Sequence, residues 1–118
     1  SLTTTTDFAN CIKKAGRYKS RSHYISVLTR CFQAIRVEVN QEMHELTTTL
    51  NQLLNCSMPL VLAIITFQPN EDRFVKSFIK QHNLSQASKK PFRLSYHQCK
   101  GNPRAKSALL RIIHLPGN

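Results

Sequence analysis

The chain has 118 residues, of which 41% are hydrophobic, so it can form one small domain or part of a larger one. Its three glycines, Gly16, Gly101 and Gly117, stand far apart, which excludes a Walker loop and a Gly-rich dinucleotide-binding fingerprint. The net charge of +11, from 17 Lys and Arg against 6 Asp and Glu, favours a polyanionic partner. Nucleic acid is the first such partner, with an anionic membrane surface and a plain solvated surface as alternatives.

The charge is unevenly distributed along the chain. Residues 1–36 hold seven basic side chains and one acid, residues 37–72 hold five acids and no Lys or Arg, and residues 73–118 hold ten basic side chains and no acid. A long basic block without acids is the electrostatic footprint of a phosphate-binding surface. We therefore expect residues 73–118 to contact nucleic acid.

Residues 1–27 are interpreted as a basic N-terminal segment made of a helix and a linker. Aspartate commonly begins helices, and we expect Asp7 to be the N-cap of a short helix over 7–15. Residues 16–26, GRYKSRSHYIS, show no apolar period and predict an exposed loop.

A long helix is predicted over residues 28–54, at the start of an α/β region that covers 28–118. Apolar side chains recur there at steps of three and four, which places them on one face of a helix. A coiled-coil seam is the alternative, although the pattern lasts for fewer than four heptads. The stripe consists of Leu28, Phe32, Ile35, Val39, Met43, Leu46, Leu50 and Leu53.

A strand is predicted over residues 60–67. Its unbroken apolar and β-branched run is typical of a central parallel strand that is buried on both faces. The run is far shorter than the roughly 20 apolar residues that span a bilayer, so we expect no membrane-spanning segment. A helix then begins with Asn70 as N-cap and extends to about residue 83. Its buried side is expected to hold Phe74, Val75, Phe78, Ile79 and His82.

The remaining residues predict two terminal strands. Residues 84–91 are polar and basic and indicate a loop, 91–96 a short strand, 98–104 a turn, and 107–115 a final strand. A long helix, a buried strand, a second helix and two terminal strands form part of an α/β layer.

The cysteines and histidines do not predict a metal site. No two of the four cysteines, Cys11, Cys31, Cys56 and Cys99, have the close spacing of metal or redox motifs, and the five histidines are scattered. A reducing compartment is favoured, with two disulfides as the alternative.

Three blocks of sequence carry a family resemblance. They are TRCFQAIRVEVNQEM at 29–43, ITFQPNEDRFVK at 65–76 and NPRAKSALLR at 102–111. In the same order they resemble the TRTFQALRIxVNxEL, ISFHSLEDRIVK and NPRARSAKLR motifs of the MraW/RsmH family. The members of that family are S-adenosylmethionine-dependent methyltransferases that act on cytosine N4 in small-subunit ribosomal RNA.

The resemblance implies the C-terminal part of a Rossmann-like class I methyltransferase fold. The family's cofactor loop and catalytic turn have no counterpart in these residues, so no cofactor-binding, catalytic or metal residue is expected on this chain. A missing N-terminal half or a partner chain would complete the fold. The chain also departs from the family at Met58-Pro59-Leu60, where the family has Pro-Gly-Gly, and at Gln68-Pro69-Asn70, where it has His-Ser-Leu.

Two functions follow from the resemblance, and a third stands against it. The chain is either part of a cytosine-N4 methyltransferase or a descendant that has lost catalysis and acts in small-subunit assembly. Its expected partners are ribosomal RNA and small-subunit ribosomal or assembly proteins, with no membrane. Its expected location is a mitochondrial ribosome, or otherwise the cytoplasm. The alternative is a small basic ribosomal or RNA-binding structural protein without methyltransferase ancestry.

The candidate RNA-binding or cleft-facing residues fall into two groups. The first lies on one side of the long helix at steps of three, three and four. It either faces the cleft or RNA, or hydrogen-bonds neighbouring loops and braces the sheet; it consists of Arg30, Gln33, Arg36 and Asn40. The second consists of Gln68, Arg73, Lys76, Lys89, Lys90, Arg104, Lys106 and Arg111. Within the motif Glu71-Asp72-Arg73 we favour stabilisation of the helix start over a reacting role. For Arg104, Lys106 and Arg111 the alternatives are phosphate contact and plain surface charge.

Overall fold

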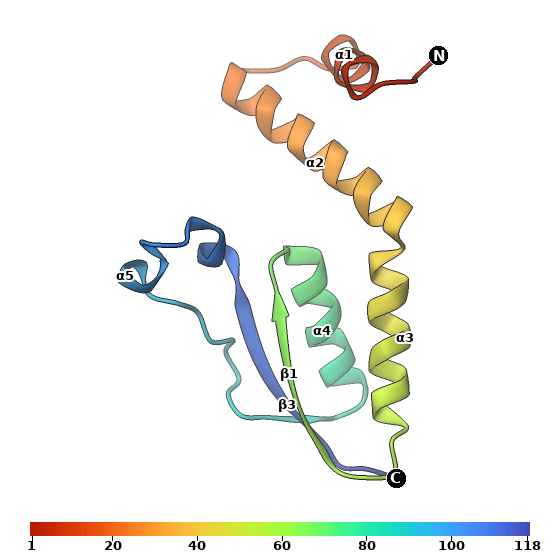
Figure 1. Cartoon of the computed structure of the whole chain (residues 1–118), viewed down its shortest axis with the longest axis vertical. Helices are drawn as coiled ribbons and strands as arrows, with labels where there is room; N and C mark the ends of the chain where they lie inside the picture. The colour runs from red at the N-terminus through yellow and green to blue at the C-terminus, as the bar shows by residue number, and fades with distance from the viewer. The chain divides into compact units, whose positions relative to one another are not determined.

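The computed structural model describes all residues, 1–118, and the chain forms two compact units, Ser1–Glu45 and Leu46–Asn118. The boundary expected between residues 27 and 28 stays a prediction. The elements in chain order are α1 (Thr5–Ala15), α2 (Arg21–Asn40), α3 (Glu42–Leu54), β1 (Leu60–Thr66), α4 (Pro69–Gln81), β2 (Ser85–Gln86), α5 (Tyr96–Cys99), the 3-10 helix η1 (Pro103–Ser107) and β3 (Leu109–Leu115) (Figure 1).

Helix α1 begins two residues earlier than expected, because its N-cap is Thr4 and not Asp7. The Thr4 side chain accepts a hydrogen bond from the Asp7 backbone N–H at 3.1 Å, and the Asp7 carboxylate accepts from the Thr4 backbone N–H at 3.0 Å. This reciprocal capping box places Asp7 inside the first turn. Hydrogen bonds, first from the Thr3 backbone and next from the Thr4 side chain, hold the pKa of Asp7 below its usual value.

The loop expected over 16–26 is wrong in its second half, where α2 already begins. Ser20 is the N-cap of α2, and its hydroxyl accepts from the His23 backbone N–H at 3.1 Å. The ring of Tyr24 stacks edge-on against Tyr18 with centroids 5.0 Å apart. These contacts with the preceding segment stabilise a first turn that has no apolar period of its own.

The continuous helix expected over 28–54 is also wrong, because the backbone of Gln41 is left-handed and separates α2 from α3. The Glu42 carboxylate accepts from Arg36 at 3.1 Å and from Asn40 at 3.2 Å, and the Gln41 side chain donates to the Glu38 carbonyl at 2.7 Å. These local polar contacts stabilise the break. The apolar stripe continues across it, so periodicity alone does not detect it.

The sheet has three antiparallel strands in the order β1-β3-β2. The expectation of a central parallel strand over 60–67 is therefore wrong: β1 lies at the edge and pairs only with β3. Its burial alternates, since Leu62 faces the core while Val61 and Ile65 are exposed. The strand expected at 107–115 is confirmed as β3, which begins at Leu109.

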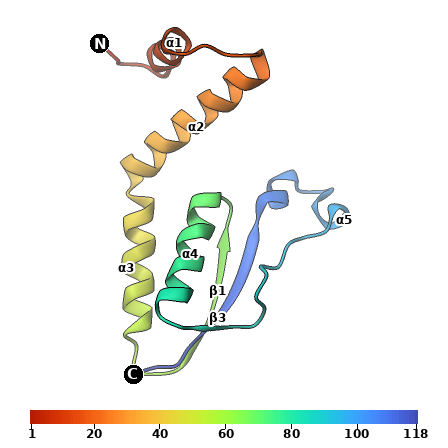
Figure 2. The ribbon, with the colours of Figure 1, turned by 180° about the vertical axis from the view of Figure 1, so that it is seen from behind.

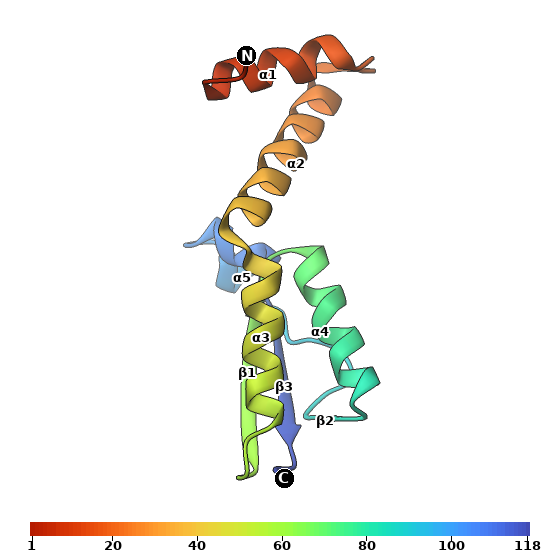
Figure 3. The ribbon, with the colours of Figure 1, turned by 90° about the vertical axis from the view of Figure 1, so that its right-hand side faces the viewer.

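Helices α3 and α4 both cover one face of this sheet, as the side view shows (Figure 3) and the view from behind supports (Figure 2). The buried centre consists of Val75, Ile79, Ile113 and Leu115, surrounded by partly buried leucines and Ile64 from α3, β1 and the segment after α4. Val75, Phe78 and Ile79 form the buried side of α4 as expected, whereas His82 is exposed.

The segment between α4 and β3 differs from the expected loop, strand and turn. Residues 85–86 form β2, and the strand expected over 91–96 is reduced to one bridge between Phe92 and Leu110. Ser95 instead caps α5 in a capping box with Gln98, at 3.3 and 2.8 Å. The Ser-x-x-Gln spacing was the available signal for this helix start.

Candidate functional site

The site begins where β1 ends and α4 starts. Pro69 is the first residue of α4, and Gln68, not Asn70, is its N-cap. The Glu71 carboxylate accepts from the backbone N–H groups of Phe67 and Gln68 at 3.1 and 3.3 Å. Glu71 therefore stabilises the helix start, as the sequence predicts.

Asp72 and Arg111 form an ion pair between α4 and β3. Arg111 Nε and Nη2 donate to the two carboxylate oxygens of Asp72 at 2.8 and 3.3 Å, and Arg111 Nη1 donates to Gln86 of β2 at 3.4 Å. The side chains are 6% and 15% exposed for Arg111 and Asp72, respectively. Arg111 therefore braces the sheet against α4. Its donors are directed at protein oxygens and its side chain is buried, which argues against both the phosphate contact and the plain surface charge that the sequence left open for it.

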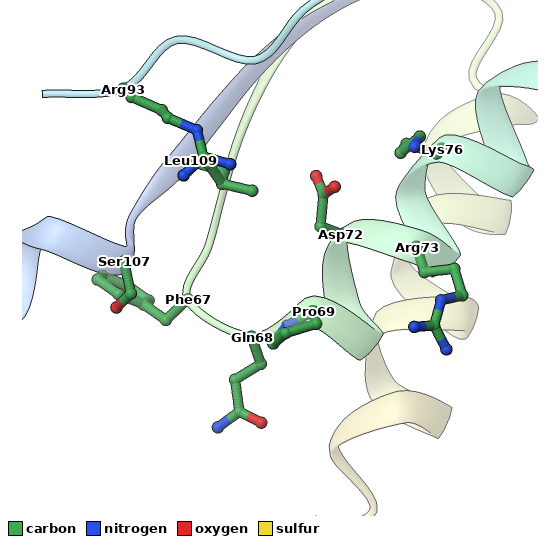
Figure 4. A pocket seen from close by; sticks show the side chains of 9 residues that line it. All are labelled: Phe67, Gln68, Pro69, Asp72, Arg73, Lys76, Arg93, Ser107 and Leu109. Atoms are coloured by element: carbon green, nitrogen blue, oxygen red, sulfur yellow. The ribbon is translucent and has the colours of Figure 1, made fainter.

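A pocket of about 400 Å³, which we call the strand-end pocket, lies beside this ion pair. Figure 4 shows Asp72 and Arg93 reaching toward the space between α4 and β3, whereas Gln68 and Arg73 extend away from it. The lining residues are Phe67, Gln68, Pro69, Asp72, Arg73, Lys76, Arg93, Ser107 and Leu109.

A second pocket of about 640 Å³, the lysine pocket, lies between α4 and the segment that follows it. Its charged lining residues are all basic, and Lys76 belongs to both this pocket and the strand-end pocket. The lining residues are Lys76, Ile79, Lys80, Asn83, Leu84, Gln86, Lys89, Lys90, Pro91 and Arg111.

A third pocket of about 410 Å³, the tyrosine pocket, lies at α5 and η1. It shares Arg93 with the strand-end pocket. Its lining residues are Arg93, Leu94, Tyr96, Cys99, Lys100, Pro103 and Lys106.

These shared residues join the three pockets into one surface, which we call the basic belt. Of the ten basic side chains in residues 73–118, nine line the belt and only Arg104 does not. Asp72 is the only carboxylate in the lining, and it is neutralised by Arg111. The belt therefore presents an excess of positive charge that suits a chain of phosphates.

The predicted residues of Leu46–Asn118 mostly meet in this belt. Gln68, Arg73, Lys76, Lys89, Lys90 and Lys106 line it, Arg104 is exposed outside it, and Arg111 is buried in its wall. The residue-level prediction missed Lys80, Arg93, Lys100 and Tyr96. The uninterrupted basic block was the signal for the three cations, whereas nothing in the sequence distinguished Tyr96 from a core aromatic.

The predicted residues of α2 lie in the other unit. Arg36 and Asn40 both donate to Glu42 at the start of α3, so their hydrogen bonds are local to the α2–α3 junction, and both roles stay predictions for them. Arg30 is exposed and Gln33 is half-buried, and for these two both roles remain predictions.

Other site types find little support in the structure. All four cysteines are free, and no group of three or more His, Cys, Asp or Glu side chains is arranged to hold a metal ion. No helix combines the length and the apolar character needed to cross a bilayer. The basic belt is therefore the strongest candidate site.

Comparison with known proteins identifies similar sequences. The model of the MraW methylase family matches residues 1–115. The ribosomal RNA small subunit methyltransferase H of Thermosipho melanesiensis is 38% identical over 119 residues, which cover 94% of this chain and 39% of that protein. The proteins of the same name from Leptospira borgpetersenii serovar Hardjo-bovis and Trichodesmium erythraeum are 41% and 37% identical, with 72% and 94% of this chain covered. The chain spans about two fifths or less of the length of these relatives.

Proposed function

Because the chain belongs to the MraW methylase family, we propose that it forms the RNA-binding C-terminal part of a small-subunit ribosomal RNA methyltransferase fold. The basic belt carries this proposal. It gathers nine basic side chains around three linked pockets, and one of them, Arg111, pairs with the single carboxylate, Asp72. Phosphate contacts of this kind position a protein on RNA and supply affinity that depends on salt.

The residues of the belt do not fit S-adenosylmethionine, the cofactor implied by the family. Nucleoside cofactors in Rossmann-like folds use a carboxylate on the ribose and a Gly-rich turn. The belt offers Lys and Arg instead, and the Asp72 carboxylate is committed to Arg111. We expect the chain alone not to bind this cofactor, and calorimetry that detected micromolar binding would contradict this.

The outer edge of β1 suggests where the rest of such a fold would join. This strand pairs only with β3, and Val61 and Ile65 leave apolar surface open on its outer face, with 69% and 59% exposure. Unpaired strand edges and exposed apolar faces are both normally covered in native proteins. We propose that a cofactor-binding part of the methyltransferase fold, in the same polypeptide or a partner, covers this edge.

A second candidate is a role in small-subunit assembly without catalysis. Gln68-Pro69-Asn70 stands at the C-terminal end of β1, where the family motif has His-Ser-Leu, and Gln68 and Pro69 line the strand-end pocket. Gln68 extends away from the strand-end pocket (Figure 4). In this case the chain keeps its contacts with ribosomal RNA and with ribosomal or assembly proteins, in a mitochondrial ribosome. Imaging of the tagged protein tests that location.

The proposed RNA contact is tested by fluorescence anisotropy of the 118-residue chain with a labelled fragment of small-subunit ribosomal RNA. We expect the logarithm of the affinity to fall linearly with the logarithm of the salt concentration. The Lys89→Ala, Lys90→Ala variant should reduce the slope by about 2, or about 1 for each lost phosphate contact.

The matched control is Lys13→Ala, Lys14→Ala, which removes the same charge from exposed positions of α1. Its slope should equal that of the unmodified chain. An equal reduction of the slope by both variants would show that the salt dependence reflects the total charge of the chain and not the belt. Absence of RNA binding would refute the proposal.

A further inference from the structure

The tyrosine pocket lies at one end of the basic belt and is large enough to be a separate binding subsite. It encloses about 410 Å³, within the range of small-ligand pockets and large enough for one nucleotide. It lies at α5 and η1 and is joined to the rest of the belt through Arg93. A strand of RNA that follows the belt would therefore pass its opening.

Tyr96 gives this pocket an aromatic surface that the lysine pocket lacks, and it is more exposed than Phe67, the aromatic residue of the strand-end pocket, which is 53% exposed. Its side chain is 77% exposed, and its one ring contact is edge-on, with the neighbouring His97 at 5.9 Å between centroids. By contrast, the rings of Tyr18 and Tyr24 pack against each other in the other unit. The Ser95 capping box holds the start of α5 in place, so the Tyr96 ring is presented on an ordered turn. An open aromatic face of this kind is a platform for base stacking.

The remaining lining residues suit the other parts of a nucleotide. Leu94 and Pro103 provide apolar wall, and Cys99 is buried. Arg93, Lys100 and Lys106 bring positive charge, and no carboxylate lines the pocket. An aromatic platform next to several cations is the combination with which proteins hold single-stranded nucleic acid.

We propose that the tyrosine pocket binds one unpaired nucleotide of the RNA, with its base stacked on Tyr96 and its phosphate facing Lys100 and Lys106. This inference rests on the proposed function, since it names the part of the RNA that enters the pocket. A base inside a duplex already stacks on its neighbours and does not expose its face, so the pocket selects single-stranded segments, loops or ends.

The test compares Tyr96→Ala and Tyr96→Phe in the full chain, using a labelled single-stranded RNA of about ten nucleotides and a duplex of the same length. We expect Tyr96→Ala to weaken single-strand binding roughly 5- to 100-fold with an unchanged salt slope, because a stacked base and not a phosphate contact is lost. Tyr96→Phe should keep the affinity, and duplex binding should be the same in all three proteins. Circular dichroism checks that the variants stay folded, which the exposure of Tyr96 predicts.

Tyrosine emission gives an independent readout, since the chain has three tyrosines and no tryptophan. Single-stranded RNA should quench this emission in the unmodified chain, and Tyr96→Phe should remove that quenching while it keeps the affinity. Single-strand affinity within twofold of normal in Tyr96→Ala would overturn the inference. If the lysine variant Lys89→Ala, Lys90→Ala still lowers the salt slope in that case, the proposed function survives. Absence of any RNA binding would refute both.

Discussion

The two faces of β1 have nearly the same composition and opposite environments. On the inner face, Leu62 lies opposite Ile113, which is completely buried under α3 and α4. On the outer face, Val61 lies opposite His114 and is 69% exposed. The apolar character of a strand therefore does not report by itself which of its faces is covered, and in residues 1–118 only one face of β1 is.

The largest expected contrast is between Leu62→Asp and Val61→Asp, which introduce the same charge at neighbouring positions on opposite faces. Leu62→Asp would place an unpaired carboxylate among the partly buried side chains that pack against the core, and it should destabilise Leu46–Asn118 by several kcal/mol. Val61→Asp should change the free energy of unfolding of the chain by less than about 1 kcal/mol, because its side chain stays in water. Urea unfolding followed by circular dichroism measures both.

Equal losses in the two variants would break the comparison. They would mean that the outer face is also covered in solution, for example by self-association. In that case the midpoint of unfolding should rise with protein concentration.

The sequence predicted the elements whose apolar pattern is strong and local. The buried side of α4 and the last strand were found because Val75, Phe78 and Ile113 follow a helical or strand period within one element. The break at Gln41 was missed because local hydrogen bonds of Glu42 and Gln41 stabilise it while the apolar stripe continues. The open face of β1 was missed because its side chains are as apolar as those of the covered face.

For the candidate site, the sequence predicted the positive charge of the surface better than it predicted the role of each residue in it. The acid-free block predicted a positive surface, and most of its charges do line one belt. Arg111 was misassigned because its partner Asp72 is 39 positions away, and only the fold brings the two together. Tyr96 was missed because its exposure depends on how α5 is held and not on its neighbours in sequence.

The second prediction concerns the ion pair of the inner face. Asp72→Asn leaves the buried Arg111 guanidinium without its counter-charge. It should lower the free energy of unfolding by about 3 kcal/mol, because the remaining charge is buried and unpaired. The double variant Asp72→Asn, Arg111→Met should cost clearly less than the sum of the two single variants. Unfolding of all four proteins in urea gives this double-mutant cycle, and additive losses would show that the pair contributes no coupling.

A smaller effect is expected from Thr66, the last residue of β1 on the inner face. Its hydroxyl is buried and has no hydrogen-bond partner, although the residue is only 4% exposed. Thr66→Val keeps the shape, removes the unsatisfied oxygen and should stabilise the chain by about 1 kcal/mol. Thr66→Ser keeps the oxygen and loses the methyl group, so it should destabilise the chain by about the same amount. Thermal unfolding separates the two, and destabilisation by Thr66→Val would reveal a partner for the hydroxyl in solution.

The smallest effect is expected on the outer face, at Ile65. This residue is 59% exposed and lies opposite Leu110. Ile65→Thr keeps the β-branched shape and replaces the ethyl group of isoleucine by a hydroxyl that is in contact with water. The free energy of unfolding should change by no more than about 0.5 kcal/mol, as at most surface positions. The inner-face counterpart Ile64→Thr packs against the buried centre and should cost more than 1 kcal/mol, since it places an unpartnered hydroxyl there. A loss of stability at Ile65 equal to that at Ile64 would show that both faces of β1 are covered within the chain itself.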